Sequence, residues 1–214
     1  MGGHWPPDGL HAHPMKRSKL TILLALALPI GIAGFWLVGT SRAATETPDY
    51  KVIRTDGKIE IRDYPALTVA TTPMEGTNMN GGFGQLFRFI TGSTEGKEKI
   101  EMTSPVLIDT AKDARTMSFI MPKAAVEKGV PKPAGESVSL GKVDAARFAV
   151  LRFPGGRTAE NEAKAIAKLK AWLGTQKIDG KGEPVFAYYD PPWTPTFLRR
   201  NEVMIRVGSK AGNP

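Results

Sequence analysis

The chain has 214 residues and a formal net charge of +8, and it contains no cysteine and three histidines, which lie between positions 4 and 13. The absence of cysteine excludes disulfides, thiol catalysis and zinc sites built from thiolates. The absence of histidine after residue 13 excludes the usual general base of hydrolases and the commonest metal ligand from the rest of the chain. The basic residues form no stripe with aromatic ones, so nucleic acid is not an expected partner.

The composition divides the chain into a leader, an export segment and one domain. Residues 1–14 are rich in Gly, Pro and His, which is typical of a disordered leader, or of a start assigned too early with Met15 as the true start. The domain is long enough to enclose a complete hydrophobic core. The expected segments are the leader 1–14, the export segment 15–43, a linker 44–49, the domain 50–207 and a tail 208–214.

The export segment begins with basic residues and continues with an uncharged apolar run from Leu20 to Val38. Ser41 and Ala43 are small residues at the positions that a signal peptidase reads, which predicts cleavage after Ala43. The apolar run also approaches the ~20 residues that span a bilayer, so a retained membrane tether through residues 20–38 is the alternative. Basic residues before such a run stay in the cytoplasm. Both alternatives therefore place the domain outside it, either in the periplasm or anchored to the membrane.

The first half of the domain is expected to contain a β-hairpin, further strands and one helix. Asp56-Gly57 is typical of a tight turn, and Ile59 and Ile61 alternate with charged residues as in a half-buried strand. Gly92 is expected to end the helix. Apolar residues recur before it at the spacing of a helix with one buried face, namely Phe83, Leu86, Phe87 and Ile90. The expected strands are 50–54, 58–64, 66–72, 105–109 and 115–121.

The second half repeats this order of elements. Thr158 is a good helix N-cap, Glu160 follows where the helix dipole favours an anion, and Gly174 is expected to end the helix. Its apolar stripe is expected at Ala159, Ala163, Ile166, Leu169 and Leu173. The expected strands are 137–143, 145–153, 184–190 and 201–207, after a connector at 128–135. The predicted fold is α+β, with two main helices on a distorted open β-barrel or antiparallel sheet built from two similar strand–strand–helix–strand–strand halves.

Three segments carry unusual residues but no catalytic signature. KIEMTSPV (99–106) and MSFIMP (117–122) each join an apolar strand to a proline. Arg88 and Phe89 lie off the predicted buried stripe of the first helix. This suits a flat anionic ligand, or else a ring packed under a strand beside a surface charge. The aromatic residues and arginines of 188–207 either line a pocket or hold a loop over the core.

These segments resemble the SOUL haem-binding family. The segments IRDYPALTVA (61–70), FGQLFRFITG (83–92), KIEMTSPV (99–106), MSFIMP (117–122) and YYDPPWTPTFLRRNEV (188–203) stand in the order of that family. The resemblance covers about 50–207 and implies a distorted β-barrel of two similar halves with two long helices. It also implies an apolar cleft beside the first helix, which binds haem or a related tetrapyrrole with basic side chains near the propionates.

Carried onto this chain, the resemblance points to Leu86, Phe87, Arg88 and Ile90 on the helix, and to Lys97, Lys99 and Met102 after it. Ligation of iron by histidine, as in some family members, does not apply, because the predicted domain contains no histidine. The porphyrin is then held mainly by apolar contacts, or a tyrosine or methionine ligates the iron. The candidates for that role are Tyr64, Tyr188, Tyr189 and Met102. Without strong ligation, weak or reversible binding is expected, with little preference for haem over metal-free porphyrin.

The sequence therefore predicts a protein that is not an enzyme and that stores, transports or buffers haem or a related tetrapyrrole. No catalytic residue and no metal site are assigned. Two alternatives remain open. One is an enzyme that demetallates or modifies tetrapyrroles, and the other is an effector-binding or protein-interaction module of the same fold.

Overall fold

The computed structural model describes residues 1–2, 45–75, 79–111 and 115–208, and the fold belongs to a unit that comprises residues 42–214. In chain order the elements are β1 Lys51–Asp56, β2 Ile59–Tyr64, β3 Leu67–Pro73, α2 Met79–Ile90, β4 Val106–Asp109, β5 Thr116–Ile120, α3 Lys123–Lys128, β6 Ser139–Val143, β7 Ala146–Phe153, α4 Ala159–Thr175, β8 Gly180–Tyr188, the 3-10 turn η1 Thr196–Leu198 and β9 Asn201–Val207. None of the helices in these ranges is long and apolar enough to cross a membrane. The predicted leader after residue 2 and the predicted export segment lie outside the described residues.

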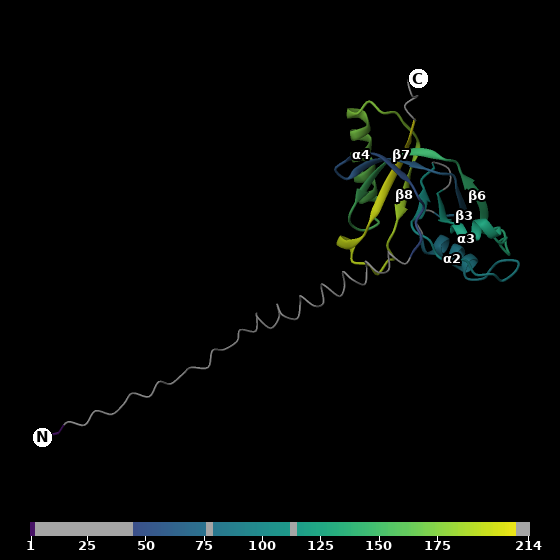
Figure 1. The fold of residues 1–214 in the computed structure, drawn as a ribbon, viewed down its shortest axis with the longest axis horizontal. Coiled ribbons are helices and arrows are strands. Elements are labelled where there is room, and N and C mark those ends of the chain that lie inside the picture. The colour runs from purple at the N-terminus through teal and green to yellow at the C-terminus, as the bar shows by residue number, and fades with distance from the viewer. Residues whose placement is uncertain (3–44, 76–78, 112–114, 209–214) are drawn as a thin grey trace. The chain divides into compact units, whose positions relative to one another are not determined.

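The described strands form one antiparallel sheet, in the order β1-β2-β7-β9-β8-β4-β5-β3-β6. The sheet is open, with β1 and β6 as its edges, and α2 and α4 cover different parts of it (Figure 1). The predicted α+β class with an open antiparallel sheet is thus confirmed, but the first half has three strands before its helix, whereas the predicted order of elements has two. The turn at Gly57 has a positive φ of 58°, which explains the glycine at this position of the first hairpin.

Each half of the chain contributes to the part of the sheet that the other half builds, β1 and β2 from the first half and β6 from the second. Strand β2 belongs to the first half by sequence but pairs with β7 of the second half, and β6 of the second half pairs with β3 of the first. The two halves of the sheet meet where β4 pairs with β8, for example at Leu107 and Ala187. Neither half can therefore complete its part of the sheet without the other.

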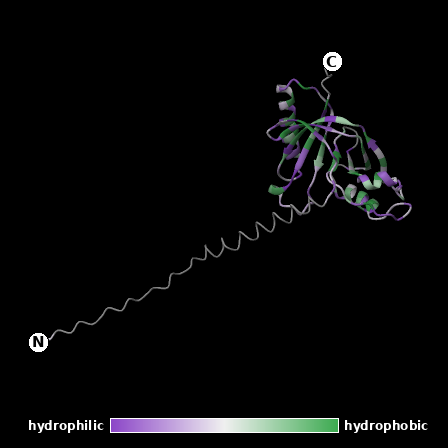
Figure 2. Cartoon of the chain, viewed as in Figure 1, coloured by the Kyte–Doolittle hydropathy of each residue, from purple (hydrophilic) through white to green (hydrophobic). Residues whose placement is uncertain are grey.

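The main core lies between the helices and one face of the sheet. Side chains alternate between the two faces of a strand, so Met117 and Phe119 of β5 are buried under α2 while Ser118 points to the opposite face. Helix α4 packs in the same way on β7, β8 and β9 through Leu169 and Leu173. Figure 2 shows the hydrophobic residues along these strands and helices. A smaller apolar cluster on the other face comprises Tyr64, Phe148, Val150, Ala187 and Met204.

The buried face of α2 differs from the prediction. Gly82, Leu86, Phe89 and Ile90 are buried, whereas Phe83 and Phe87 are 39% and 47% exposed. Contacts with the sheet fix this orientation. A Cβ at Gly82 would lie 3.5 Å from side-chain atoms of β3 and of the residue that follows it, so glycine lets the helix approach the sheet closely. The predicted core positions of the two phenylalanines were therefore wrong.

Helix α4 confirms its predicted N-cap but not its whole stripe. The side chain of Thr158 accepts a hydrogen bond of 3.2 Å from the backbone N–H of Asn161. The buried residues are Ala165, Leu169 and Leu173, while the predicted stripe residues Ala159 and Ala163 are exposed. Helix α3, just before the expected connector, was not predicted, because none of its six residues is buried and it therefore has no apolar stripe.

Candidate functional site

The sheet face opposite the helices contains a cavity of about 630 Å³. We call it the central cleft. Strands β2, β7 and β9 form one side of it, and β3, β5 and β6 form the other. Leu107 of β4 and Val185 of β8 line it where the two halves of the sheet meet. A cavity of this size lies within the range of natural small-molecule sites, so the cleft is the candidate functional site.

The alternation of side chains along each strand builds the cleft. Leu67, Val69 and Thr71 of β3 line it, whereas Ala70 and Thr72, which alternate with them, are buried on the helix side. Along β9, Met204 and Arg206 line the cleft, and the residues on either side of them enter the main core. The same strands therefore supply both the core and the ligand-sized cavity.

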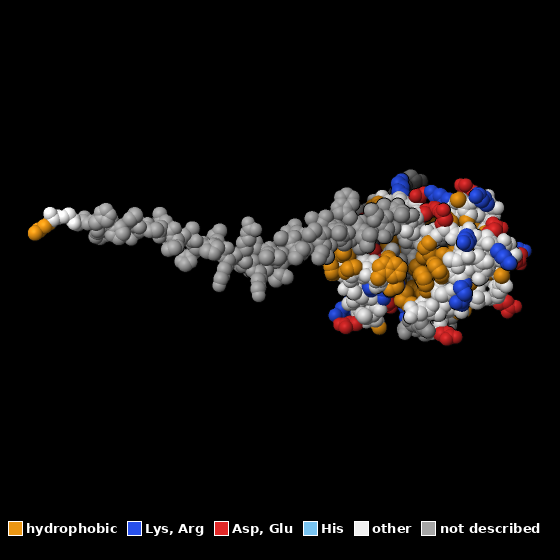
Figure 3. All heavy atoms as spheres, turned by 90° about the horizontal axis from the view of Figure 1, so that it is seen from below, with side chains coloured by type: hydrophobic (Ala, Val, Ile, Leu, Met, Phe, Trp, Pro, Cys, Tyr) orange, Lys and Arg blue, Asp and Glu red, His pale blue; other side chains and the backbone are white. Residues whose placement is uncertain are grey.

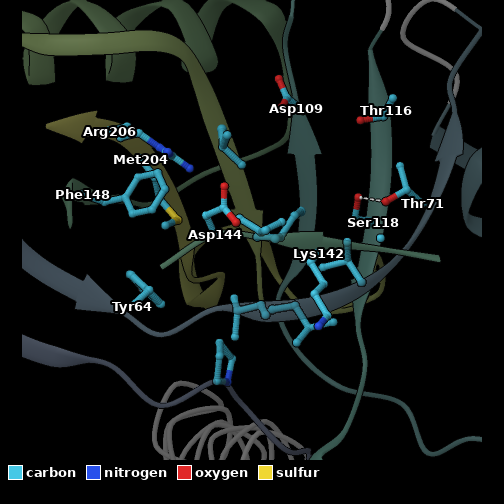
Figure 4. Close-up of a pocket in the computed structure, with 18 of the residues that line it drawn as sticks. Tyr64, Thr71, Asp109, Thr116, Ser118, Lys142, Asp144, Phe148, Met204 and Arg206 are labelled. Carbon is cyan, nitrogen blue, oxygen red and sulfur yellow. Dashed lines mark hydrogen bonds between the residues drawn. The ribbon is translucent and has the colours of Figure 1, made fainter. Parts of the chain in front are cut away.

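The two sides of the cleft differ in chemistry. Tyr64, Phe148 and Met204 lie together on one side (Figure 4), and the rings of Tyr64 and Phe148 meet edge to face with centroids 5.8 Å apart. Hydroxyl groups gather on the other side, where Thr71 Oγ1 and Ser118 Oγ are hydrogen-bonded at 2.8 Å. A flat apolar ligand would find ring and thioether contacts on the first side and hydrogen-bonding groups on the second.

Charged side chains of both signs complete the lining. The cations are Lys142, Lys181 and Arg206, and the anions are Asp109, Asp144 and Glu183. The guanidinium of Arg206 lies 5.7 Å from the centre of the Phe148 ring. Within the described residues, none of the three cations forms an ion pair, so they are available to the carboxylates of a ligand.

A buried polar network adjoins the aromatic side of the cleft. Glu202 is fully buried and accepts hydrogen bonds from Arg62 at 2.8 and 3.1 Å and from Arg200 at 2.8 and 3.0 Å. The Tyr189 hydroxyl donates to the same carboxylate at 3.1 Å. Burial alone would raise the pKa of Glu202, but the hydrogen bonds and charges of the two arginines outweigh it and lower the pKa. Glu202 is thus an anion that the protein itself neutralises.

Two of the tyrosines named as candidate iron ligands, Tyr64 and Tyr189, line the cleft. Burial raises the pKa of Tyr64 to about 12, although the neighbouring Arg62 acts in the opposite direction. Burial, followed by the charge of Glu202, also raises the pKa of Tyr189. A raised pKa disfavours the phenolate form, so both groups would ligate iron less readily than an ordinary tyrosine does. Tyr188 points into the main core, where its hydroxyl donates to Glu162 at 2.6 Å.

The residues that the resemblance indicated lie on the helix side of the sheet or in the loop after α2, and none of them lines the central cleft. Leu86 and Ile90 are in the main core, and Met102 packs against it. The remaining four, Phe87, Arg88, Lys97 and Lys99, are exposed. Phe87 stacks on Phe83 with ring centroids 5.9 Å apart. These residues remain a prediction for ligand binding on α2.

The predictions for Phe89 and for the run 188–207 have different outcomes. Phe89 is 1% exposed and packs in the main core, so the interpretation that its ring contacts a ligand was wrong. In the run, Tyr189, Met204 and Arg206 line the cleft. Its proline-rich loop is held by Arg199, which donates to the backbone carbonyl of Thr194 at 2.8 Å. The run therefore contributes both to a pocket and to a fixed loop.

The family model of the SOUL heme-binding proteins matches residues 45–206. The chain belongs to the SOUL family. The match covers every strand and helix described above except the last residue of β9. The SOUL chain therefore belongs to a family of heme-binding proteins, as its sequence motifs indicated. No curated protein matches it.

Solved structures share the fold of this SOUL chain at low sequence identity. The C-terminal domain of EcmrR is 11% identical with a TM-score of 0.55, and the match covers 75% of this chain and 98% of that one. A conserved protein from Listeria innocua is 11% identical with a TM-score of 0.53, over 71% and 92% of the two chains. A hydrolase from the same organism is 10% identical with a TM-score of 0.51, over 73% and 94%. At these identities the likeness concerns the fold alone.

Proposed function

We propose that this SOUL protein reversibly binds haem or a related tetrapyrrole in the central cleft, without histidine ligation, and that it does so outside the cytoplasm. The observation that carries the proposal is the cavity of about 630 Å³ in a member of a heme-binding family. Burial of apolar surface contributes about 25 cal/mol per Å² before the costs of association. A macrocycle with two large apolar faces is a ligand that such a cleft suits.

The two sides of the cleft supply different parts of the binding energy. Tyr64, Phe148 and Met204 offer apolar and ring contacts to the macrocycle. Lys142, Lys181 and Arg206 offer charge-assisted hydrogen bonds to its propionates. Acidic groups equal in number to the cations also line the cleft, and they repel the propionates. The ligand is therefore expected to bind in the orientation that places its propionates next to the cations.

Iron contributes little to this binding. The only histidines of the chain lie between positions 4 and 13, so the domain offers phenols and thioethers instead of imidazole. The raised pKa values of Tyr64 and Tyr189 oppose the loss of the proton that ligation of iron by a phenol requires. We therefore expect similar affinities for hemin and for the metal-free porphyrin, each recovered chemically unchanged after release.

An absorbance titration of residues 44–214 with hemin and with metal-free porphyrin tests this proposal. The decisive variant is Gly141→Phe, because a Cβ at this cleft position meets no atom within 4 Å and the new ring would occupy the cleft. We expect this variant to raise the dissociation constants for both ligands at least tenfold. Gly174→Phe is the matched control, since this exposed position on α4 is equally open, and it should bind as the parent does.

A second pair of variants separates the cleft from α2. Arg206→Glu reverses a cation of the cleft and Arg88→Glu reverses an exposed cation of the helix. We expect Arg206→Glu to weaken binding several-fold and Arg88→Glu to leave it unchanged. The opposite result, together with normal binding by Gly141→Phe, would place the ligand on α2 and refute the cleft site. Tight hemin binding without uptake of metal-free porphyrin would refute binding without strong ligation, and conversion of hemin into a product would indicate an enzyme.

A further inference from the structure

Large apolar side chains are exposed mainly at one end of the domain. In the loop and turn before β9, Trp193 is 83% exposed and Phe197 is 77% exposed. Val126 of α3 and Phe87 of α2 are exposed at 43% and 47%. Monomeric soluble proteins leave single apolar residues exposed, but a group of aromatic ones at one end indicates a contact surface.

The strand register brings η1 and α3 to the same end of the sheet. Asn201, which follows η1 in the chain, pairs with Tyr188, and Tyr188 pairs with Val106 on the other side. Val106 in turn pairs with Phe119, four residues before α3 begins. Figure 1 shows α2, α3 and the yellow turn η1 at the lower end of the domain, and Figure 3 shows hydrophobic side chains gathered on that end.

The described chain enters the domain at this end. Glu46 forms an isolated bridge with Thr103, and its side chain accepts a hydrogen bond of 3.0 Å from the backbone N–H of Lys123, the first residue of α3. The uncharged run ends at Val38 in the sequence. The six residues 39–44 that separate it from the first residue of the described domain span at most about 20 Å, at roughly 3.5 Å per residue.

We infer that this end of the domain, formed by α3, η1 and the last turn of α2, is a lipid-contacting surface. Trp193 and Phe197 enter the headgroup region of a bilayer in which residues 20–38 are the retained tether. Trp is enriched at membrane interfaces because its ring is amphipathic. The exposed Arg88 beside Phe87 can pair with lipid phosphates. The short connection to the tether favours lipid over a second copy of the chain, because it holds this end near the bilayer.

The absence of cysteine from the chain makes a direct test possible. The full chain is placed in vesicles of phosphatidylcholine and phosphatidylglycerol as Phe197→Cys or Val126→Cys, each labelled with an environment-sensitive fluorophore. Ala171→Cys is the matched control, because it is exposed on the last part of α4. That part leads to Gly180, which pairs with Val207 at the far end of β9 from η1. Nitroxide groups on the lipid headgroups serve as the quencher.

We expect several-fold stronger quenching at positions 197 and 126 than at 171. Removing the aromatic residues with Trp193→Ser and Phe197→Ser should lower quenching of the Val126→Cys label at least twofold. Val52→Ser with Ile53→Ser, which removes exposed apolar side chains from β1 instead, should leave it unchanged. Equal quenching at all three labels would overturn the inference. A fluorescence change that depends on the number of protein molecules per vesicle rather than on the quencher would also overturn it, because it would indicate contact with a second copy of the chain. Recovery from cells of a chain that starts after Ala43 would also overturn it.

Discussion

Glu202 is an acidic residue whose side chain is fully buried in the described domain. Its carboxylate depends on Arg62, Arg200 and Tyr189 for its hydrogen bonds. Removing one member of such a network leaves the others buried without a partner, which costs more than the network itself contributes. This loss of stability can be measured without any ligand present.

Replacing Glu202 by Gln should lower the free energy of unfolding by about 3 kcal/mol, because the buried Arg62 and the partly buried Arg200 both lose the charged carboxylate that they bond. Urea unfolding followed by circular dichroism measures this change. Glu60→Gln is the control, since Glu60 bonds the same Arg62 at 2.6 Å but is partly exposed, and it should cost less than about 1 kcal/mol. Equal losses of unfolding free energy in the two variants would show that the buried Glu202 carboxylate stabilises the fold no more than the partly exposed Glu60 does.

Acid should weaken the parent protein more than Glu202→Gln. The folded-state pKa of Glu202 is lowered from its ordinary value of 4.5 because the two arginines outweigh the effect of burial. A lowered pKa stabilises the folded protein above the unfolded-state value, and this contribution is lost as the pH falls through the folded-state value. Urea midpoints measured between pH 7 and pH 3 should therefore converge for the two proteins below about pH 4.5. A constant difference would contradict the assignment.

The sequence could not reveal this network. The motif RRNEV was recognised only as a mark of a family, because Arg62 stands 140 positions away from Glu202 and nothing in a single sequence pairs them. Tyr64 and Tyr189 were named as candidate iron ligands and do line the cleft. Their raised pKa values depend on burial, which the residue types alone do not give.

At the scale of elements, helix α2 shows what an apolar pattern can and cannot determine. The helix and its end at Gly92 were predicted, but two overlapping stripes of apolar residues each satisfy the helical period. Contacts with β3 choose between them. Thr72 donates a hydrogen bond to Gln85, and Gly82 allows close approach to the sheet. Tertiary packing thus buries Phe89 and exposes Phe87.

Alanine variants of neighbouring residues on α2 should report this orientation. Leu86→Ala should lower the free energy of unfolding by about 2–5 kcal/mol, because Leu86 is fully buried. Phe87→Ala should change it by about 0.5 kcal/mol or less, as for other surface substitutions. Chemical unfolding of both variants under the same conditions gives the comparison. Similar losses would mean that Phe87 belongs to the core, as the apolar spacing had predicted.

At the scale of the whole molecule, the exchange of β2 and β6 makes the two halves depend on each other. A repeated order of elements along the chain does not say that β2 of the first half and β6 of the second half each pair with a strand of the other half. The central cleft was missed for a related reason. Its lining comes from alternate residues of several strands between positions 64 and 206, and each strand alone shows only an ordinary alternation.

This interdependence predicts one cooperative unfolding transition for residues 44–214. Small single domains, up to about 150 residues, usually unfold without populated intermediates, and the shared sheet leads us to expect the same of this slightly longer domain. Curves followed by circular dichroism, by the fluorescence of Trp172, a residue of α4 that packs against the main core, and by the fluorescence of Trp193 should coincide. Two separated transitions would show that the halves fold independently despite their exchanged strands.

The pairing of β4 with β8 joins the two halves directly beneath the cleft. A ligand bound in the cleft, as proposed, would contact strands on both sides of this junction and hold them together. Because it fits only the assembled sheet, its binding energy resists unfolding, by about 2.7 kcal/mol at a hundredfold excess over its dissociation constant. We therefore expect proteases to cleave the ligand-free protein more readily than the protein with the proposed ligand bound.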